Sequence, residues 1–311
     1  MATVDVLLAA YNGEKYIREQ IDSILGQTFR DFRLLIRDDG SKDATPEIIG
    51  EYEGRYPGVV KAVSDDEPHG GAAINFFQLM KHAEADYMMF ADQDDYWLPD
   101  KIQVSLDGIR ELEARTGRDR PALVFPDYTV VDAALKPITV KNKNLQVTET
   151  RNALTLNKLL VQNYVTGCLI MANRSLYKAM GDYAEGVVMH DWWAALYAQT
   201  CGTLRHIPKV VMFYRQHGDN CIGAKDANRF KYYWGKFMDP ATKDVQKDYC
   251  RQALLFRKRY GGELDEDALK TLDNFIALYD CKSKLGRVRA LLKGGYLKSD
   301  WARILGQIAY I

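Results

Sequence analysis

The sequence predicts an α/β protein with a doubly wound, mainly parallel sheet and a helical C-terminal extension. Short apolar runs alternate with segments of helical periodicity over about the first hundred residues. Acidic or small polar residues follow several of these runs, where the carboxyl ends of parallel strands would lie. From Asn228 onward only helical patterns occur. We therefore expect a sheet domain over residues 1–222 and a helical extension over residues 223–311.

The first part of the chain contains four predicted strands separated by three predicted helices. The apolar runs predict strands at residues 4–10, 32–36, 59–63 and 87–90. The helical spacing predicts helices over residues 17–25, 45–56 and 73–82. The second of these helices has Thr45 as its expected N-cap, with a proline and an acid directly after it. This alternation is typical of a parallel, doubly wound sheet.

The pattern is less regular after residue 100. A helix is expected over residues 101–115, and residues 127–150 are polar and read as an irregular loop. The remaining expected elements are strands at 122–125, 165–171 and 203–214 and helices at 154–162 and 191–200.

Composition indicates an ordinary globular protein. The 311 residues are 47% apolar and 27% charged, and the 42 basic residues balance the 42 acidic ones, so nothing points to nucleic acid. Five cysteines without a C-x-x-C pair indicate neither a disulfide framework nor a zinc site, which favours a cytoplasmic location. We expect no signal peptide, and no apolar run approaches the roughly 20 residues of a membrane span.

Three polar loops are predicted at one edge of the sheet. They are Ala9-Ala10-Tyr11-Asn12, Asp38-Asp39-Gly40-Ser41 and Asp92-Gln93-Asp94-Asp95. Three carboxylates in four residues repel one another unless a cation or ample water is present, and such ligands suit Mg²⁺ or Mn²⁺ beside phosphates. An acidic surface turn is the alternative. The glycine motifs of dinucleotide sites and of phosphate loops are absent.

Four segments in order resemble family 2 glycosyltransferases with the GT-A fold. They are residues 4–13, 23–32, 38–43 and 92–101, and the likeness extends over roughly residues 3–220. The Asp-Gln-Asp-Asp-x-Trp form is similar to the rhamnosyltransferase-like branch that builds bacterial cell-surface polysaccharides. The resemblance implies a Rossmann-like mixed sheet flanked by helices.

The resemblance also implies a nucleotide-sugar site with a Mg²⁺ or Mn²⁺ cofactor. Asp39 would contact the base and Asp92 the ribose. Asp94 would bind the metal with His217 as a further ligand, although a structural histidine is the alternative. The other implied donor contacts are Ala9, Ala10, Tyr11, Asn12, Asn75, Gln93 and Arg215, with Asp38 and Asp95 in support. For Asp38 and Asp39, simple turn chemistry is the alternative.

The acceptor side is expected around Met189-His190-Asp191-Trp192-Trp193. The family pattern makes Asp191 the catalytic base, and an ordinary acid at a helix N-terminus is the alternative. Trp192 and Trp193 would stack on a sugar or belong to the core. Gly167 would allow close approach of the acceptor or serve packing.

The last thirty residues are strongly basic. Residues 282–311 hold seven basic side chains and one acid, a net charge of +6, and their apolar residues have helical spacing. Basic amphipathic helices with tryptophan suit an anionic membrane surface. Helices packed on the sheet domain with a solvated basic face are the alternative.

These patterns predict an inverting, metal-dependent glycosyltransferase. The expected donor is a dTDP- or UDP-sugar, rhamnose above all, and the expected acceptor is a saccharide or lipid-linked saccharide. The enzyme would work in the cytoplasm or peripherally on the inner face of the membrane. The alternatives are a nucleotidyltransferase acting on sugar phosphates and a catalytically silent carbohydrate-binding protein. A nucleotidyltransferase would need a basic, glycine-rich loop after the first strand, and residues 9–13 do not form one.

Overall fold

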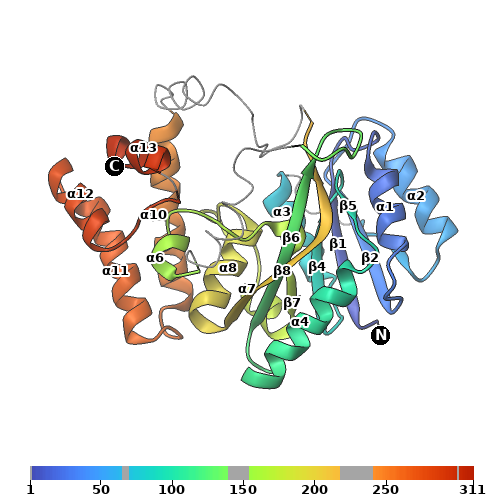
Figure 1. The fold of residues 1–311 in the computed structure, drawn as a ribbon, viewed down its shortest axis with the longest axis horizontal. Helices are drawn as coiled ribbons and strands as arrows, with labels where there is room; N and C mark the ends of the chain where they lie inside the picture. The colour runs from blue at the N-terminus through green and yellow to red at the C-terminus, as the bar shows by residue number, and fades with distance from the viewer. Residues whose placement is uncertain (1, 65–69, 139–153, 218–240, 300) are drawn as a thin grey trace.

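The computed structural model describes residues 2–64, 70–138, 154–217, 241–299 and 301–311. Within them an eight-stranded sheet has the strand order β3-β2-β1-β4-β7-β6-β8-β5. The C-terminal helices gather at the end of the molecule farthest from α1 and α2 (Figure 1). The fold is thus an α/β sheet with a helical C-terminal region, as predicted.

The N-terminal half of the sheet is parallel. Its strands are β1 (Val4–Ala10), β2 (Phe32–Asp38), β3 (Val60–Ala62) and β4 (Tyr87–Asp92), joined by α1 (Ile17–Leu25), α2 (Thr45–Arg55) and α3 (Ala72–Lys81). β1 and β4 read as continuous apolar runs because both faces of their inner part are covered. The register pairs Ala10 with Asp38 and Ala9 with Asp92, so the three predicted loops do start at one edge.

The C-terminal half makes the sheet mixed. Its strands are β5 (Tyr96–Trp97), β6 (Ala122–Val131), β7 (Met171–Asn173) and β8 (Thr203–Arg215). β7 runs antiparallel to β4 and β6, β5 runs antiparallel to β8, and β6 and β8 are parallel. The order of elements therefore predicted the parallel half correctly, whereas the mixed character followed from the family resemblance.

Several predicted boundaries were wrong. The strand expected at 165–171 is a 3-10 turn, η1 (Gly167–Leu169), followed by the short β7; the Gly167 N–H is taken by a side chain and joins no ladder. β6 extends to Val131 into the expected loop, of which residues 139–153 lie outside the described part. The helix expected at 154–162 is only α6 (Leu156–Leu159).

The expected N-cap of α2 was also wrong. Ala44 occupies that position, and Thr45 is the first helical residue. The Thr45 hydroxyl donates to Asp43 Oδ1 at 2.5 Å and accepts from the Gly13 N–H at 2.8 Å. Thr45 thus links the start of α2 to the loop after β1.

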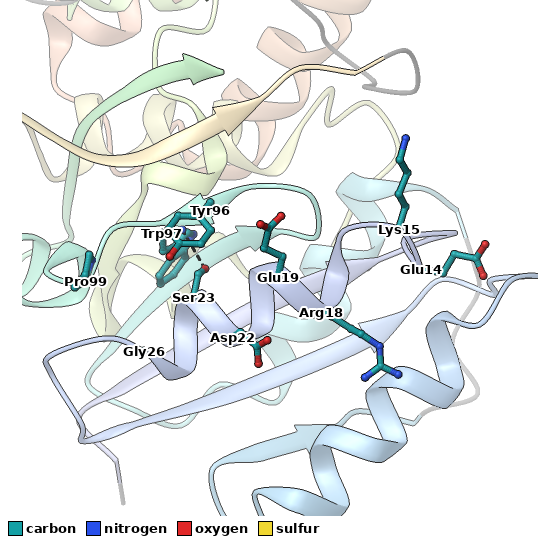
Figure 2. Close-up of a pocket in the computed structure, with 10 residues that line it drawn as sticks. All are labelled: Glu14, Lys15, Arg18, Glu19, Asp22, Ser23, Gly26, Tyr96, Trp97 and Pro99. Atoms are coloured by element: carbon teal, nitrogen blue, oxygen red, sulfur yellow. Dashed lines mark hydrogen bonds between the residues drawn. The ribbon is translucent and has the colours of Figure 1, made fainter. Parts of the chain in front are cut away.

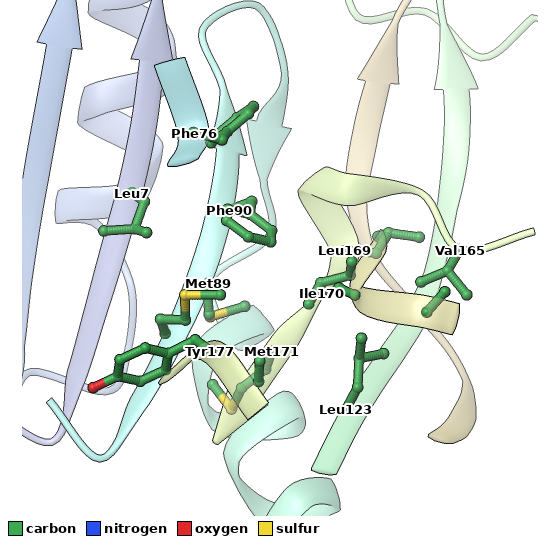
Figure 3. Packing of buried hydrophobic residues seen from close by; sticks show 14 of the residues in the cluster. Leu7, Phe76, Met89, Phe90, Leu123, Val165, Leu169, Ile170, Met171 and Tyr177 are labelled. Atoms are coloured by element: carbon green, nitrogen blue, oxygen red, sulfur yellow. The ribbon is translucent and has the colours of Figure 1, made fainter. Parts of the chain in front are cut away.

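One apolar core joins the sheet to the helical extension. Leu7, Phe90 and Ile170 belong to its centre (Figure 3), and it continues through Trp193 to Phe256. The helices that surround it are α4 (Lys101–Thr116), α7 (Arg174–Met180), α8 (His190–Cys201), α10 (Ala241–Tyr260), α11 (Glu266–Asp280), α12 (Lys284–Lys293) and α13 (Trp301–Tyr310). The predicted domain boundary at 222 lies outside the described residues, but α10 shares the core of the sheet domain. No described helix is both long and apolar enough to span a bilayer.

Candidate active site

Gln93 fastens the loop after β4 to the loop after β1. Its Nε2 donates to the Tyr11 carbonyl and its Oε1 accepts from the Tyr11 N–H, both at 2.8 Å. A Cβ on Gly13 would lie 2.2 Å from Gln93 Oε1, so this contact depends on the glycine. Gln93 thus joins the two loops, and its contact with the donor stays a prediction. Tyr11 itself is 55% exposed and stands at the edge above Ala9 and Ala10.

The loops after β1 and β2 are also joined. Asn12, in a left-handed conformation with φ 47°, donates its N–H to Ser41 Oγ at 2.7 Å and accepts from the Lys42 N–H at 2.8 Å. Asp38 accepts from the N–H groups of Gly40 and Ser41, so its role is the turn chemistry considered as the alternative. The predicted nucleotide-site segment is therefore a rigid rim.

Asp39 differs from Asp38 because it caps a more distant loop. Its carboxylate accepts from the N–H groups of Gly70 at 3.3 Å and Gly71 at 2.8 Å. Arg37 lies 3.5 Å away, and only 8% of Asp39 is exposed. The turn alternative does not describe Asp39. A carboxylate with further lone pairs can still accept one more hydrogen bond at this rim.

Asn75 points inward. It is 2% exposed and donates to the carbonyls of Ala10 at 3.4 Å and Arg37 at 3.2 Å, while its Oδ1 accepts from Arg37 at 3.2 Å. Asn75 thus braces the ends of β1 and β2, which corrects the prediction that it contacts the donor.

Asp94 and His217 form a close pair, although they are 123 positions apart in the sequence. His217 Nε2 lies 2.8 Å from Asp94 Oδ2, and the two side chains are 12% and 17% exposed. The His217 ring packs at 4.7 Å between centroids on Tyr16. A carboxylate and an imidazole are ligands that Mn²⁺ and related ions accept, and a bound ion would replace this hydrogen bond. These are the two residues predicted to hold the metal.

Arg215 binds the backbone of Asp94. Its Nε donates to the Asp94 carbonyl at 2.8 Å and its Nη1 to the Ala133 carbonyl at 2.6 Å, and it forms an ion pair with Glu19. Only 1% of Arg215 is exposed. These contacts make Arg215 a positioning residue for the loop that carries Asp94, and its contact with a diphosphate stays a prediction.

Asp92 and Asp95 lie deeper, next to Cys168. Each of the three offers a possible ligand atom, and these atoms all lie within 4.8 Å of one another. Burial, followed by the charges of Asp94 and Asp191, raises the pKa of Asp92 to about 7. Burial and the neighbouring Asp92 raise the pKa of Asp95 well above its usual range. Both shifts favour the protonated form of these carboxyls.

Lys101 is a buried basic residue whose charge interacts with Asp92 and Asp95, and the sequence analysis assigned it no role. It is fully buried, and its Nζ donates to the Cys168 carbonyl at 2.5 Å and lies 3.7 Å from the centroid of the Trp97 ring. Burial lowers the pKa of Lys101 to about 8, against the opposing charges of Asp95 and Asp92. One feature of the sequence could have indicated a role for Lys101. It stands at the first position of α4, where the helix dipole disfavours a positively charged side chain.

Asp191 is held by two backbone N–H groups at the start of α8. It accepts from Gly167 at 3.1 Å and from Trp192 at 2.6 Å, while Met189 occupies the N-cap position. Burial raises the pKa of Asp191 to about 6. The charge of Asp191 also contributes to the raised pKa of Asp92. A carboxylate with a pKa near neutrality is suited to accept a proton.

The two tryptophans after the predicted base belong to the core. Trp192 is 6% exposed and donates from Nε1 to the Leu159 carbonyl at 2.5 Å. Trp193 is fully buried and donates to the Tyr260 hydroxyl at 3.3 Å. The core alternative therefore holds for both, and the prediction that they stack on an acceptor sugar was wrong.

His190, directly before the base, is a second residue whose role the sequence did not indicate. It is 3% exposed and packs between Phe76 and Phe90, at 4.0 and 4.5 Å between ring centroids. Neither of its ring nitrogens has a hydrogen-bond partner within the described residues. Burial lowers its pKa to about 3, so the ring is neutral.

We expect Gly167→Ala to displace the base. The added Cβ would lie 2.8 Å from His190 Nε2 and 3.3 Å from Asp191 Cβ, so one of these side chains must move. Because a shift of about 1 Å can cost roughly 10²-fold in rate, kcat should fall about 10- to 100-fold while donor binding is retained. The matched control is Gly54→Ala on α2, where an added Cβ meets nothing within 4 Å. Equal activity of the two variants would contradict a close fit at Gly167.

A separate polar groove of about 510 Å³ runs between α1 and β5. Figure 2 shows Glu19, Asp22 and Arg18 along α1 on one side, with Tyr96 and Trp97 on the other. None of Asp92, Asp94 and Asp191 lines it, so it is distinct from the acidic edge. Glu19 belongs to both regions, since it lines the groove and pairs with Arg215.

Comparisons with known proteins agree with this geometry. The family profile "Glycosyl transferase family 2" matches residues 5–152. The dTDP-rhamnosyl transferase RfbG of Shigella flexneri is 29% identical over 239 residues, which are 72% of this chain and 76% of that protein. An uncharacterized protein of Mycobacterium tuberculosis, Rv1520, is 26% identical over 74% of this chain, and the chain spans 63% of its length.

Solved structures with low identity share the fold. Staphylococcus aureus TarS 1–349 in complex with UDP-GlcNAc has a TM-score of 0.54 at 15% identity, over 99% of this chain and 90% of that one. The Pyrobaculum calidifontis mannosyltransferase PcManGT in complex with GDP-Man and Mn²⁺ has a TM-score of 0.54 at 16% identity, over 94% and 79%. The chain covers 49% of the longer TarS chain. The chain thus carries a glycosyl transferase family 2 match over residues 5–152, has the GT-A fold and is a glycosyltransferase.

Proposed function

We propose that the chain transfers a sugar, rhamnose above all, from a dTDP- or UDP-sugar to a saccharide acceptor, with a divalent metal and inversion at the anomeric carbon. The observation that carries the proposal is the meeting of Asp94 and His217 at the sheet edge where β4 ends in Asp92. RfbG, whose name states a dTDP-rhamnosyl transferase, supports the choice of donor. We place the reaction in bacterial cell-surface polysaccharide synthesis.

The residues at the edge fit a Mg²⁺ or Mn²⁺ ion. Asp94 and His217 would hold it, and the nearby carboxyl of Asp92 adds negative charge. When bound, such an ion neutralises the charge that develops on a departing nucleoside diphosphate. Tyr11, Asp39 and the rim after β1 would receive the nucleoside part of the donor. That PcManGT was solved with Mn²⁺ supports the choice of cofactor.

Asp191 would act as the general base. Its carboxylate takes the proton of an acceptor hydroxyl while that oxygen attacks the anomeric carbon, and the bond to the diphosphate oxygen breaks. Attack from the face opposite to the leaving group inverts the anomeric configuration. The N–H groups of Gly167 and Trp192 fix the carboxylate for this transfer. Gly167 thus serves the acceptor side through Asp191.

The raised pKa of Asp191 predicts the acid limb of the pH–rate profile. The base works only when ionised, so kcat should be constant above about pH 7 and fall about tenfold per pH unit below its pKa of about 6. Initial rates at saturating donor and acceptor, measured between about pH 4.5 and 8, test this. A rate that stays constant down to pH 4.5, as an ordinary aspartate would allow, would count against the assignment.

A donor panel distinguishes the candidate functions. The protein is incubated with dTDP-, UDP- and GDP-sugars and a mixed oligosaccharide acceptor, with Mn²⁺ or with a chelator. Release of nucleoside diphosphate that depends on Mn²⁺ supports sugar transfer. In a parallel incubation with a nucleoside triphosphate and a sugar phosphate, release of pyrophosphate supports the nucleotidyltransferase. Binding of saccharide without either product supports the catalytically silent carbohydrate-binding protein.

The proposal extends to the domain boundaries of the chain and to the place where it works. We propose that residues 1–222 form the transferase domain and that residues 223–311 are an extension of it rather than an independent unit, which the shared core supports. We also propose that the acceptor is lipid-linked and that the enzyme works on the inner face of the membrane.

A further inference from the structure

The surface of α12 and α13 exposes large apolar side chains. Among the described residues, Leu285 is 81% exposed, Leu292 52%, Trp301 68% and Leu305 56%. By contrast, Leu291 on α12 is fully buried. Tyr296, in the segment between α12 and α13, is almost fully buried. The helices thus bury one face against the protein and leave a second apolar face open. We call the four exposed residues the apolar tail surface.

Basic side chains are interleaved with this surface. On α12 and just before it, Lys282, Leu285, Arg289 and Leu292 follow one another at spacings of three, four and three residues, which places them on one helical stripe. All four are exposed. The segment 282–311 carries a net charge of +6, with seven basic residues and one acid. An ordinary solvated face would lack the leucines, and an interface with an apolar protein would lack the charges.

The two helices are held to the rest of the chain. Lys284 Nζ donates to the Ala309 carbonyl at 2.7 Å, which joins the start of α12 to the end of α13. Asn157 and Lys158 of α6 donate to the carbonyls of Gly294 and Leu297 at 2.6 and 2.9 Å. Since α6 contacts α8, which carries Asp191, the surface is connected to the acceptor side of the site. Its end of the molecule lies away from α1 and α2 (Figure 1).

We infer that the apolar tail surface binds an anionic lipid bilayer. Exposed leucine and tryptophan enter the boundary of the acyl region, and the interleaved lysine and arginine residues meet the acidic headgroups. The inference deepens the proposed function, on which it rests for its purpose, because a bilayer-bound enzyme meets a lipid-linked acceptor in two dimensions. The binding itself needs neither donor nor metal.

Vesicle sedimentation of the full chain tests the inference. The probes are vesicles of phosphatidylglycerol with phosphatidylcholine and vesicles of phosphatidylcholine alone. We expect at least about tenfold stronger binding to the anionic vesicles, lost in about 1 M salt, where the Debye length falls to about 3 Å. Equal binding to both kinds of vesicle, or none, overturns the inference.

A triple variant and a matched control locate the surface. Leu285→Glu combined with Leu292→Glu and Trp301→Glu changes only exposed side chains and should lower vesicle binding at least about tenfold. Leu254→Glu on α10, 48% exposed, places one glutamate at an exposed leucine outside this surface and should bind as the unchanged protein does. Circular dichroism confirms folding of each. If the unchanged protein is a dimer that the triple variant abolishes, the surface is a self-contact and the inference is wrong. Because no donor is present, these results are independent of the transfer reaction.

Discussion

Replacing Asp191 by asparagine is expected to lower kcat for sugar transfer by about 10³-fold. The amide cannot take the proton of the acceptor hydroxyl, although it has nearly the same shape. It can still accept from Gly167 or Trp192, so the start of α8 should stay in place. Metal-dependent donor binding, measured as a thermal shift with nucleotide sugar and Mn²⁺, should remain within about twofold because the proposed metal ligands are Asp94 and His217.

The control for this variant is Asp119→Asn, which changes an exposed aspartate in the turn after α4. It should have the kcat of the unchanged protein, since surface substitutions are usually neutral. If Asp191→Asn keeps more than about a tenth of the activity, Asp191 is no general base and the proposed mechanism is wrong. A weakened donor thermal shift would show instead that the residue serves the fold or the donor.

Replacing Asp94 by asparagine should give the opposite pattern. The neutral amide is a poor metal ligand, so the thermal shift that Mn²⁺ and nucleotide sugar produce together should vanish, and kcat/KM should fall about 10³-fold, a loss of about 4 kcal/mol of transition-state stabilisation. His217→Ala should act in the same direction, because its Nε2 lies 2.8 Å from Asp94 Oδ2. Titration with Mn²⁺ followed by thermal shift measures both effects.

A double variant makes the assignment of the metal more specific. If Asp94 and His217 hold one ion, the loss in the double variant should be much less than the sum of the two single losses. Additive losses would show that the two side chains act separately. An Asp94→Asn protein with an unchanged Mn²⁺ response would place the ion elsewhere, with Asp92, Asp95 and Cys168 as the other group of potential ligands.

The sequence predicted the parallel half of the fold well because its signals are strong there. β1 and β4 are mostly apolar runs, and polar or acidic residues follow them at the edge that parallel strands share. The pairing of Asp94 with His217 came from the family resemblance, since no local pattern connects residues 123 positions apart. β7 was misplaced because three residues carry little periodicity and its neighbours come from distant parts of the chain.

The direction in which polar side chains point was the least predictable part. Gln93, Asn75 and Arg215 stand in or near the motifs, yet each satisfies backbone groups of a neighbouring loop. Chemistry alone does not distinguish an amide that binds a ligand from one that braces a loop. The tryptophans after Asp191 illustrate the same limit, because only α10, far along the chain, makes Trp193 a core residue.

Lys101 has a mechanical consequence for the catalytic cycle. Its ammonium group contacts the Trp97 ring on β5, which follows the acidic loop. The same group donates to the carbonyl of Cys168, the residue after Gly167, whose N–H binds Asp191. One buried side chain therefore ties the strand after the acidic loop to the turn before Asp191. A displacement of either segment is expected to disturb the other, because Lys101 contacts both.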